Sequence, residues 1–160
     1  MPDLIVERVD RPIEEARAHL AELDAELSAT YTPDQRHGLA VDRVFQPSVA
    51  FFVVRFEGAA IGCGGIAFDD GFAELKRMYV KPAMRGKGAV QALIARLATE
   101  AGARGYSRLT LETGDAQTAA IRAYERAGFR RCEPFGAYAA LSSHTIARSV
   151  FMDKRLASAP

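Results

Sequence analysis

The sequence predicts a single α/β (α+β) domain, residues 1–160, in which helices flank a mixed β-sheet. The length of 160 residues suits one hydrophobic core. Apolar segments in the first half of the chain are joined by short turns, which is typical of antiparallel hairpins. The second half alternates strand-like and helix-like segments, which is typical of parallel strand pairs. Together these patterns favour a sheet that contains both kinds of pairing.

The first half of the chain contains the predicted hairpins. Leu4–Val9 is a candidate strand, and Pro12 suits the first turn of a helix that runs to Leu27. One face of that helix carries apolar residues at helical spacing: Ile13, Ala16, Leu20, Leu23 and Leu27. Thr32-Pro33-Asp34 could open a second short helix. Three strands follow, at Val49–Phe56, Ala59–Phe68 and Phe72–Val80, and glycines in the middle one let another backbone approach closely.

The second half contains the clearest helix, Val90–Ala101, whose apolar residues recur at i, i+3, i+4 and i+7. Gly105 is a candidate stop for this helix. A strand at Leu109–Glu112 and a helix at Ala116–Ala127, closed by Gly128, come next. The last expected strand is Ser149–Lys154.

The composition excludes several classes of protein. A formal net charge of +1 and the lack of a basic block argue against a nucleic-acid partner. The two cysteines, Cys63 and Cys132, and the three histidines are scattered without metal-ligand spacing, so we expect no metal site. No signal peptide and no apolar run of membrane-spanning length is visible, so we expect a cytoplasmic protein with no membrane partner. A monomer and a homodimer both remain open.

The first candidate site is the segment Arg85-Gly86-Lys87-Gly88-Ala89-Val90, which follows a strand and opens the amphipathic helix. Such a turn exposes unpaired N–H groups at the positive end of the helix dipole, which suits a phosphate or pyrophosphate. The spacing is neither that of a P-loop nor that of a dinucleotide fold. A plain strand-to-helix turn would explain these residues equally well.

Two further residues could carry chemistry. Tyr124 lies on the helix that ends at Gly128-Phe129, where a core role is the simpler reading. Glu74 lies inside a predicted strand, where an unpaired charge is costly. It could pair with Lys76 or Arg77, or face a cleft and accept protons.

The chain resembles the GNAT N-acetyltransferase superfamily in two places. Val80–Gly88 is similar to the acetyl-CoA motif Arg/Gln-x-x-Gly-x-Gly/Ala, and Ala120–Phe129 is similar to the second signature of the family. The two lie at the usual separation and in the usual order, so the resemblance extends over essentially the whole chain. It is closest to a bacterial subgroup of small acetyltransferases.

The resemblance implies a splayed central sheet whose gap takes the pantetheine arm of coenzyme A. Backbone groups of Met78, Tyr79 and Val80 would pair with the arm, and the amides of Arg85–Val90 would hold the pyrophosphate. Gln117 and Tyr124 would complete the contacts, with Tyr124 protonating the departing thiolate. Glu74 has the spacing of a catalytic glutamate, eleven residues before Arg85. Two positions depart from the family pattern, because Val90 replaces Gly or Ala and Gln117 replaces Asn.

The expected reaction is direct attack of a neutral amine on the thioester of acetyl-CoA, without a metal. Glu74 is the expected base, with Glu112 or water as alternatives, and a backbone N–H near Met78–Val80 is the expected oxyanion donor. An acyl-enzyme on a cysteine is disfavoured, because neither thiol has a neighbouring histidine. The acceptor is expected to be a small-molecule amine, read by Thr30–Gln46 and Phe135–Ser149. A protein acetyltransferase and a non-catalytic acyl-CoA sensor remain alternatives.

Overall fold

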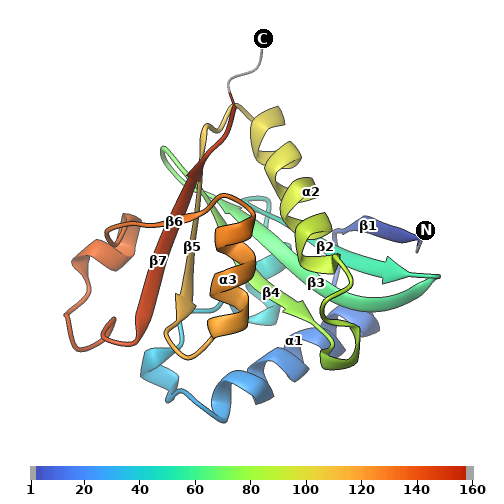
Figure 1. Ribbon diagram of the computed structural model, residues 1–160, viewed down its shortest axis with the longest axis horizontal. Helices are drawn as coiled ribbons and strands as arrows, with labels where there is room; N and C mark the ends of the chain where they lie inside the picture. Colours follow the sequence, from blue (N-terminus) through green and yellow to red (C-terminus); the bar gives the residue numbers. More distant parts are fainter. Residues whose placement is uncertain (1–2, 158–160) are drawn as a thin grey trace.

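The structure, a computed structural model, describes residues 3–157 and has one mixed sheet with helices on both faces (Figure 1). The strands are β1 (Leu4–Val9), β2 (Val49–Phe56), β3 (Ala59–Phe68), β4 (Ala73–Val80), β5 (Arg108–Gly114), β6 (Arg130–Arg131) and β7 (Ser149–Arg155). The α-helices are α1 (Glu14–Ser28), α2 (Ala89–Ala103) and α3 (Thr118–Arg126). Short 3-10 helices are η1 (Pro33–Gln35), η2 (Val41–Phe45), η3 (Pro82–Met84) and η4 (Gly136–Ala140).

The sheet has the strand order β1-β2-β3-β4-β5-β7-β6. Strands β4 and β5 pair in parallel, and the other neighbouring pairs are antiparallel. The predicted mixed sheet is therefore confirmed. The single parallel pair follows from the chain path, because α2 carries the backbone from the end of β4 back to the start of β5.

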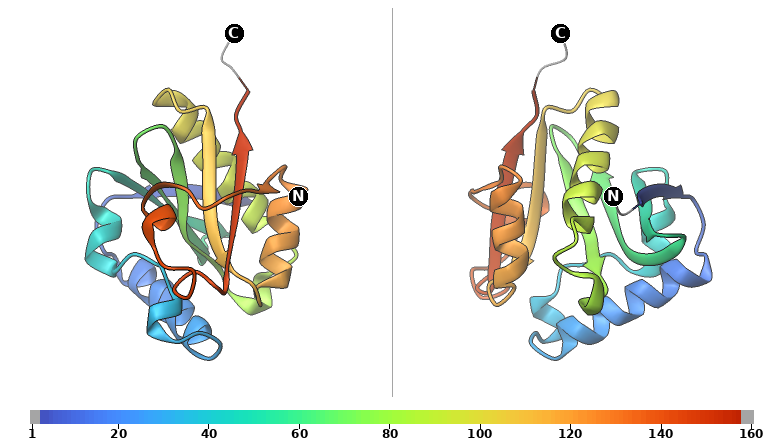
Figure 2. Two further views of the ribbon diagram at one scale, coloured as in Figure 1. Left: turned by 90° about the vertical axis from the view of Figure 1, so that its left-hand side faces the viewer. Right: turned by 45° about the vertical axis from the view of Figure 1, so that its right-hand side comes forward.

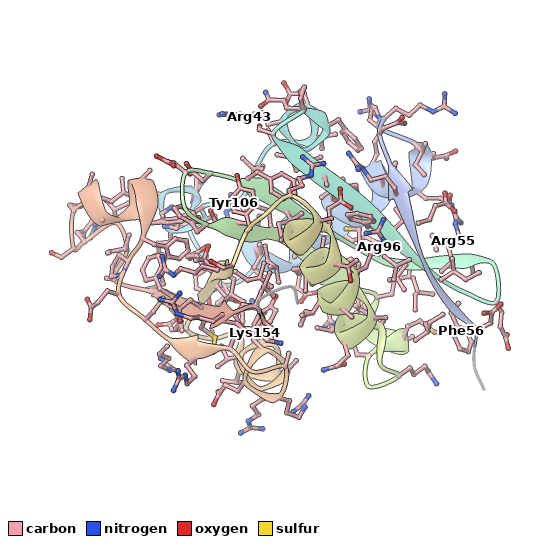
Figure 3. All side chains as sticks on the ribbon, turned by 90° about the horizontal axis from the view of Figure 1, so that it is seen from above. Arg43, Arg55, Phe56, Arg96, Tyr106 and Lys154 are labelled. Atoms are coloured by element: carbon pink, nitrogen blue, oxygen red, sulfur yellow. The ribbon has the colours of Figure 1, made fainter. Side chains whose placement is uncertain are left out.

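Two hydrophobic cores lie on opposite faces of the sheet. Helices α2 and α3 cover one face (Figure 2), where Leu93, Leu97 and Ile121 pack in one core with strand residues such as Phe52. On the same side, the Arg96 guanidinium lies 4.7 Å from the centroid of the Phe52 ring (Figure 3). Helix α1 covers the other face, where Leu20 is fully buried. The apolar stripe predicted for this helix supplies that second core.

Helices α2 and α3 end as the sequence predicts. Beyond α3, the Phe129 N–H donates to the Tyr124 carbonyl and the Gly128 N–H donates to the Glu125 carbonyl, both at 3.0 Å. This is a Schellman ending, and the Phe129 ring packs back on Tyr124 with centroids 5.9 Å apart. The N–H groups of Gly105 and Tyr106 close α2 in the same way. These two glycines set where each helix stops and where the following strand begins.

The short helix expected to begin at Thr32-Pro33-Asp34 is present as the 3-10 helix η1, with Thr32 at its N-cap. The 3-10 helices η2, η3 and η4 and the strand β6 lie in segments for which no element was expected. More important for the site, β4 carries a β-bulge where its register against β3 shifts between Cys63 and Gly65. Arg77 sits in this bulge with φ of 57°, a conformation that is uncommon for a residue other than glycine.

Within residues 3–157, no helix has both the length and the apolar character needed to cross a membrane. The same part of the chain holds no group of three or more His, Cys, Asp or Glu side chains placed to bind a metal ion.

Candidate active site

The candidate site lies where β4 and β5 separate. These strands pair only from Ala73–Leu109 to Leu75–Leu111, and beyond that point they diverge (Figure 1). A cavity of about 130 Å³ occupies this region, and we call it the β4–β5 cavity. Its lining comes from the sheet, from α1 and α3, and from the segment after α1: Leu23, Leu27, Tyr31, Gln35, Arg36, His37, Gly38, Leu75, Lys76, Arg77, Met78, Leu111, Glu112, Thr113, Gly114, Gln117, Ala120 and Tyr124.

The glycine turn before α2 has the properties of an anion site. Gly86 and Gly88 have φ of 79° and 88°, which side chains rarely adopt. A Cβ on Gly86 would meet no atom within 4 Å, and one on Gly88 would meet only Leu4 at 3.9 Å, so the turn borders open space. The first turn of α2 carries no acidic residue, and its leading N–H groups have no partner within the helix. The donors present therefore fit a pyrophosphate.

The side chains of the turn contribute unequally. Arg85 points back to the protein, where its Nη2 lies 2.8 Å from Glu26 and its Nε donates to the Val80 carbonyl at 2.8 Å. Lys87 is exposed, and Ala89 is buried at the start of α2. Val90, the departure from the family pattern, is half-buried against the α2-side core. Because Glu26 and Val80 occupy the Arg85 guanidinium, the backbone amides and the exposed Lys87 ammonium are the donors that this turn offers to a ligand.

Tyr124 lies on α3 and lines the β4–β5 cavity. Its side chain is only 6% exposed, and its hydroxyl has no hydrogen-bond partner among residues 3–157. Burial raises the pKa of this phenol, and the nearby Glu112 carboxylate raises it further. The phenol is thus protonated at neutral pH, as a proton donor must be.

Glu112 lies on β5 and lines the same cavity. Ser149 donates a hydrogen bond of 2.7 Å to its carboxylate. Burial raises the pKa of Glu112, while Ser149, His37 and Lys76 oppose that shift by stabilising the charged form. A carboxylate with a raised pKa is a stronger base than an ordinary one.

Glu74 lies on β4 but is not part of the cavity lining. Its carboxylate lies 3.2 Å from the Lys76 ammonium and accepts a 2.7 Å hydrogen bond from the Tyr138 hydroxyl. Both members of the ion pair are nearly buried, with side chains 11% and 12% exposed. Glu74 was expected either to pair with a neighbouring charge or to accept protons in a cleft. This geometry is that of a paired charge.

The other residues expected to bind coenzyme A are distributed around the bulge. Met78 lines the cavity, whereas the Tyr79 ring packs in the α1-side core, 6.0 Å from the ring of His19. Val80 is buried, and its carbonyl accepts the Arg85 bond. Gln117 precedes the first turn of α3 and also lines the cavity.

Several cavity residues were not singled out by sequence reasoning. Gln35, Arg36 and His37 reach the cavity from the segment after α1. A segment without regular periodicity gives no signal for this approach. His37 falls within Thr30–Gln46, a stretch expected to determine acceptor specificity, but the sequence of this stretch did not predict which residues contact the acceptor.

An opened parallel strand pair beside a glycine turn, with a tyrosine and a glutamate in one cavity, fits the acyl-CoA-dependent acyltransferase that the sequence predicts. The Acetyltransferase (GNAT) family matches over residues 16–129. An IAA acetyltransferase from Azospirillum brasilense is 38% identical over 141 residues, which cover 86% of this chain and 92% of that protein. The chain belongs to the GNAT family, and it is an acyl-CoA-dependent acetyltransferase.

Solved structures agree with this assignment. A Klebsiella pneumoniae protein provisionally described as an acyl-CoA N-acyltransferase has a TM-score of 0.77 and 31% identity, covering 96% of this chain and 98% of that one. A GNAT family acetyltransferase from Elizabethkingia anophelis with acetyl-CoA bound shares the fold, with a TM-score of 0.67 and 17% identity, covering 96% and 98% of the two chains.

Proposed function

We propose that this enzyme transfers the acetyl group of acetyl-CoA to the primary amine of a small molecule, by direct attack within a ternary complex. One observation carries the proposal: Tyr124 and Glu112, a proton donor and a proton acceptor, line the same cavity where β4 and β5 part. Acetyl-CoA supplies the activated acyl group. The protein has to bind it, bring a neutral amine beside it, and move two protons.

Binding of coenzyme A is assigned to the glycine turn and to the open edge of β4. The N–H groups from Arg85 to Val90 would hold the pyrophosphate, because the turn is open and carries no acidic side chain in the first turn of α2. Past Leu75, β4 is no longer paired with β5, so its backbone groups around Met78–Val80, apart from the Val80 carbonyl that accepts from Arg85, would be available to the pantetheine arm. Gln117 and Tyr124 border the same path.

The base is assigned to Glu112 rather than to Glu74, the residue that sequence spacing favours. An alkylammonium has a pKa of about 10 and must lose a proton before it attacks. Glu112 reaches the cavity and has a raised pKa, whereas Glu74 is occupied by Lys76 and Tyr138. Glu74 acts on Glu112 through its charge, which raises the pKa of Glu112.

Tyr124 is assigned as the acid that protonates the thiolate of coenzyme A, since its hydroxyl is protonated and has no partner among the described residues. A backbone N–H of the β4 bulge would stabilise the oxyanion of the attacked carbonyl. An acyl-cysteine route has little support. Cys63 is fully buried, and burial raises the pKa of its thiol to about 12, which suppresses the nucleophilic thiolate.

The names of two similar proteins support a small acceptor. The relative from Azospirillum brasilense is an IAA acetyltransferase. A chain of the same fold, with 16% identity and a TM-score of 0.72, is an aminoglycoside 6'-N-acetyltransferase. The cavity is also small, at about 130 Å³, although a peptide side chain could enter it.

The test is a panel of primary amines incubated with acetyl-CoA, with thiol release followed over time and products identified by mass spectrometry. We expect amine-dependent thiol release and a product heavier by one acetyl group. A lysine-containing peptide in the same panel tests the protein-acetyltransferase alternative. Tight binding of acetyl-CoA in calorimetry without release by any amine would favour the acyl-CoA sensor and contradict the proposal.

A further inference from the structure

We infer that the acceptor of this enzyme is an amino acid or a similar amine that carries a carboxylate, which Arg36 and His37 bind from the segment after α1 that lines the β4–β5 cavity. This inference rests on the proposed function and specifies its acceptor. Its basis is twofold: nitrogen atoms of Arg36 and His37 have no hydrogen-bond partner, and the other cations of the cavity wall are already paired.

Arg36 supplies a cation with an unused donor. Its Nε is buried and has no hydrogen-bond partner, while Nη1 donates to the Ser28 hydroxyl at 3.0 Å. It makes no ion pair with any carboxylate of residues 3–157. A buried guanidinium nitrogen without a partner is costly, and guanidinium binds carboxylate through two parallel N–H bonds.

His37 presents a second unsatisfied nitrogen to the same cavity. Its Nε2 is buried without a partner, and its ring packs edge-on against Tyr138 with centroids 5.8 Å apart. Because Nε2–H is a hydrogen-bond donor in one tautomer and in the protonated ring, it can share a carboxylate with the adjacent arginine. Two adjacent unused donors indicate an acceptor group that comes with the ligand.

The charges of the remaining cations of the cavity are already paired within the protein, although the Arg77 Nε also has no hydrogen-bond partner. The Lys76 ammonium contacts Glu74 at 3.2 Å, the His37 carbonyl at 3.1 Å and the Tyr138 hydroxyl at 2.9 Å, which uses its three donors. Arg77 pairs with Asp24 at 2.8 Å. Arg36 is therefore the cation of this wall whose charge the described protein does not neutralise.

The segment that carries Arg36 and His37 is held in place, as a binding site requires. The Thr32 N–H donates to the Gln35 side chain at 3.0 Å, and Lys76 holds the His37 carbonyl. Just before this segment, the Tyr31 hydroxyl accepts a 2.8 Å bond from the Ala116 N–H. These bonds tie the segment to β4 and to the turn before α3, which holds the backbone that carries Arg36 and His37 in place.

The cavity lining therefore offers partners for both charges of an amino acid. Glu112 and Tyr124 lie on β5 and α3, where Glu112 would receive the proton of the amine, and the unsatisfied nitrogens of Arg36 and His37 lie on the segment after α1. A molecule with an ammonium and a carboxylate complements both sets of groups. A plain alkylamine would leave the arginine without a counter-charge.

The experiment compares amines that differ only in the carboxylate. β-Alanine is paired with ethylamine and with β-alaninamide, and L-phenylalanine with 2-phenylethylamine and L-phenylalaninamide. The readout is kcat/KM from thiol release at saturating acetyl-CoA. We expect the better carboxylate of the panel to exceed its neutral partners by roughly 10- to 100-fold, the range of a charge-assisted hydrogen bond to a buried group.

Two variants test whether Arg36 causes the preference for carboxylate substrates. Arg36→Gln should lower kcat/KM for the carboxylate substrates by roughly 10- to 100-fold and leave the neutral amines unchanged, so the preference disappears. Arg43→Gln removes the same charge from an exposed residue of η2 outside the cavity (Figure 3), and it should keep the wild-type preference. Melting temperatures and CoA affinities of both variants control for folding.

The possible failures are distinguishable. A wild type that binds CoA and acetylates the neutral amines as well as, or better than, the carboxylates would overturn the acceptor class and leave acetyl transfer intact. A preference that survives in Arg36→Gln would overturn the assigned residue. A wild type that binds acetyl-CoA but acetylates no amine at all would overturn the proposed function and this inference with it.

Discussion

Replacing Glu112 by glutamine tests its role as the base separately from its effect on the fold, because turnover should fall while stability should rise. The Ser149 hydroxyl, 2.7 Å from the carboxylate, can donate equally well to the amide oxygen of glutamine. The side chain therefore keeps its shape and its hydrogen bond, and loses only its charge. Loss of a general base typically lowers turnover by about 100- to 10,000-fold, which corresponds to about 3–5 kcal/mol of activation free energy.

Stability should change in the other direction. Burial raises the pKa of Glu112 in the folded protein above its value in the unfolded chain. The ionised form is then less favourable in the folded state, so at pH values above both pKa values the wild type carries a free-energy cost that the neutral amide lacks. We expect Glu112→Gln to melt at a higher temperature than the wild type at pH 7. The difference should vanish below the ordinary pKa of a glutamate, about 4.3, where the wild-type carboxyl is protonated in both states.

The assays are steady-state thiol release with an accepted amine and thermal melts between pH 4 and pH 8. In the wild type, kcat/KM should rise with pH through the raised pKa of Glu112, because the base has to be ionised. Wild-type turnover in Glu112→Gln would refute its role as the base. A melting temperature that falls at pH 7 would refute the argument from burial, even if turnover were lost.

Three further perturbations test other parts of the site. Glu74→Gln should lower the free energy of unfolding by about 3 kcal/mol, because Lys76 is left as a nearly buried charge; a stable variant with a 100-fold lower kcat would instead restore Glu74 as the base. Tyr124→Phe should melt like the wild type, since the hydroxyl has no partner among the described residues, and should lose about 10-fold or more in kcat; full activity would exclude the acid role. Gly88→Asp should weaken CoA binding by about 10- to 30-fold in calorimetry through repulsion at the start of α2, whereas Gly88→Ala, with the same backbone strain at φ of 88°, separates charge from conformation; equal losses in both would contradict the electrostatic reading.

Most of the fold was predictable because it depends on local patterns. The apolar spacing of Val90–Ala101 and the glycines after α2 and α3 determine helix position and length, and the alternation of turns and apolar runs determines the hairpins. The bulge at Arg77 was not predictable, since nothing in the local sequence marks an arginine with positive φ. Its cause is tertiary, because the guanidinium pairs with Asp24 of α1 and also donates to the Leu20 carbonyl.

The site residues also differ in whether local sequence patterns predict their positions. Residues on regular elements next to a glycine turn, such as Gly88 and Tyr124, lie where their patterns predict, although their roles remain proposals. Glu74 shows the limit of spacing arguments. Its position along the strand is as expected, but which partner its carboxylate meets depends on Tyr138, which is 64 residues away. Arg36 and His37 lie in an irregular segment, so only the folded chain places them in the cavity.

The charged residues of β4 explain how one strand organises the acceptor side of the cavity. Glu74 holds the η4 segment through the Tyr138 hydroxyl, Lys76 holds the segment after α1 through the His37 carbonyl, and Arg77 holds α1 through Asp24. A central strand that carries three charges is costly unless each charge is paired, and here Glu74 pairs with Lys76 and Arg77 pairs with Asp24. The strand at which the sheet opens therefore also positions the segments around the cavity, because the residues that follow Ala73 on β4 both leave β5 and hold these segments.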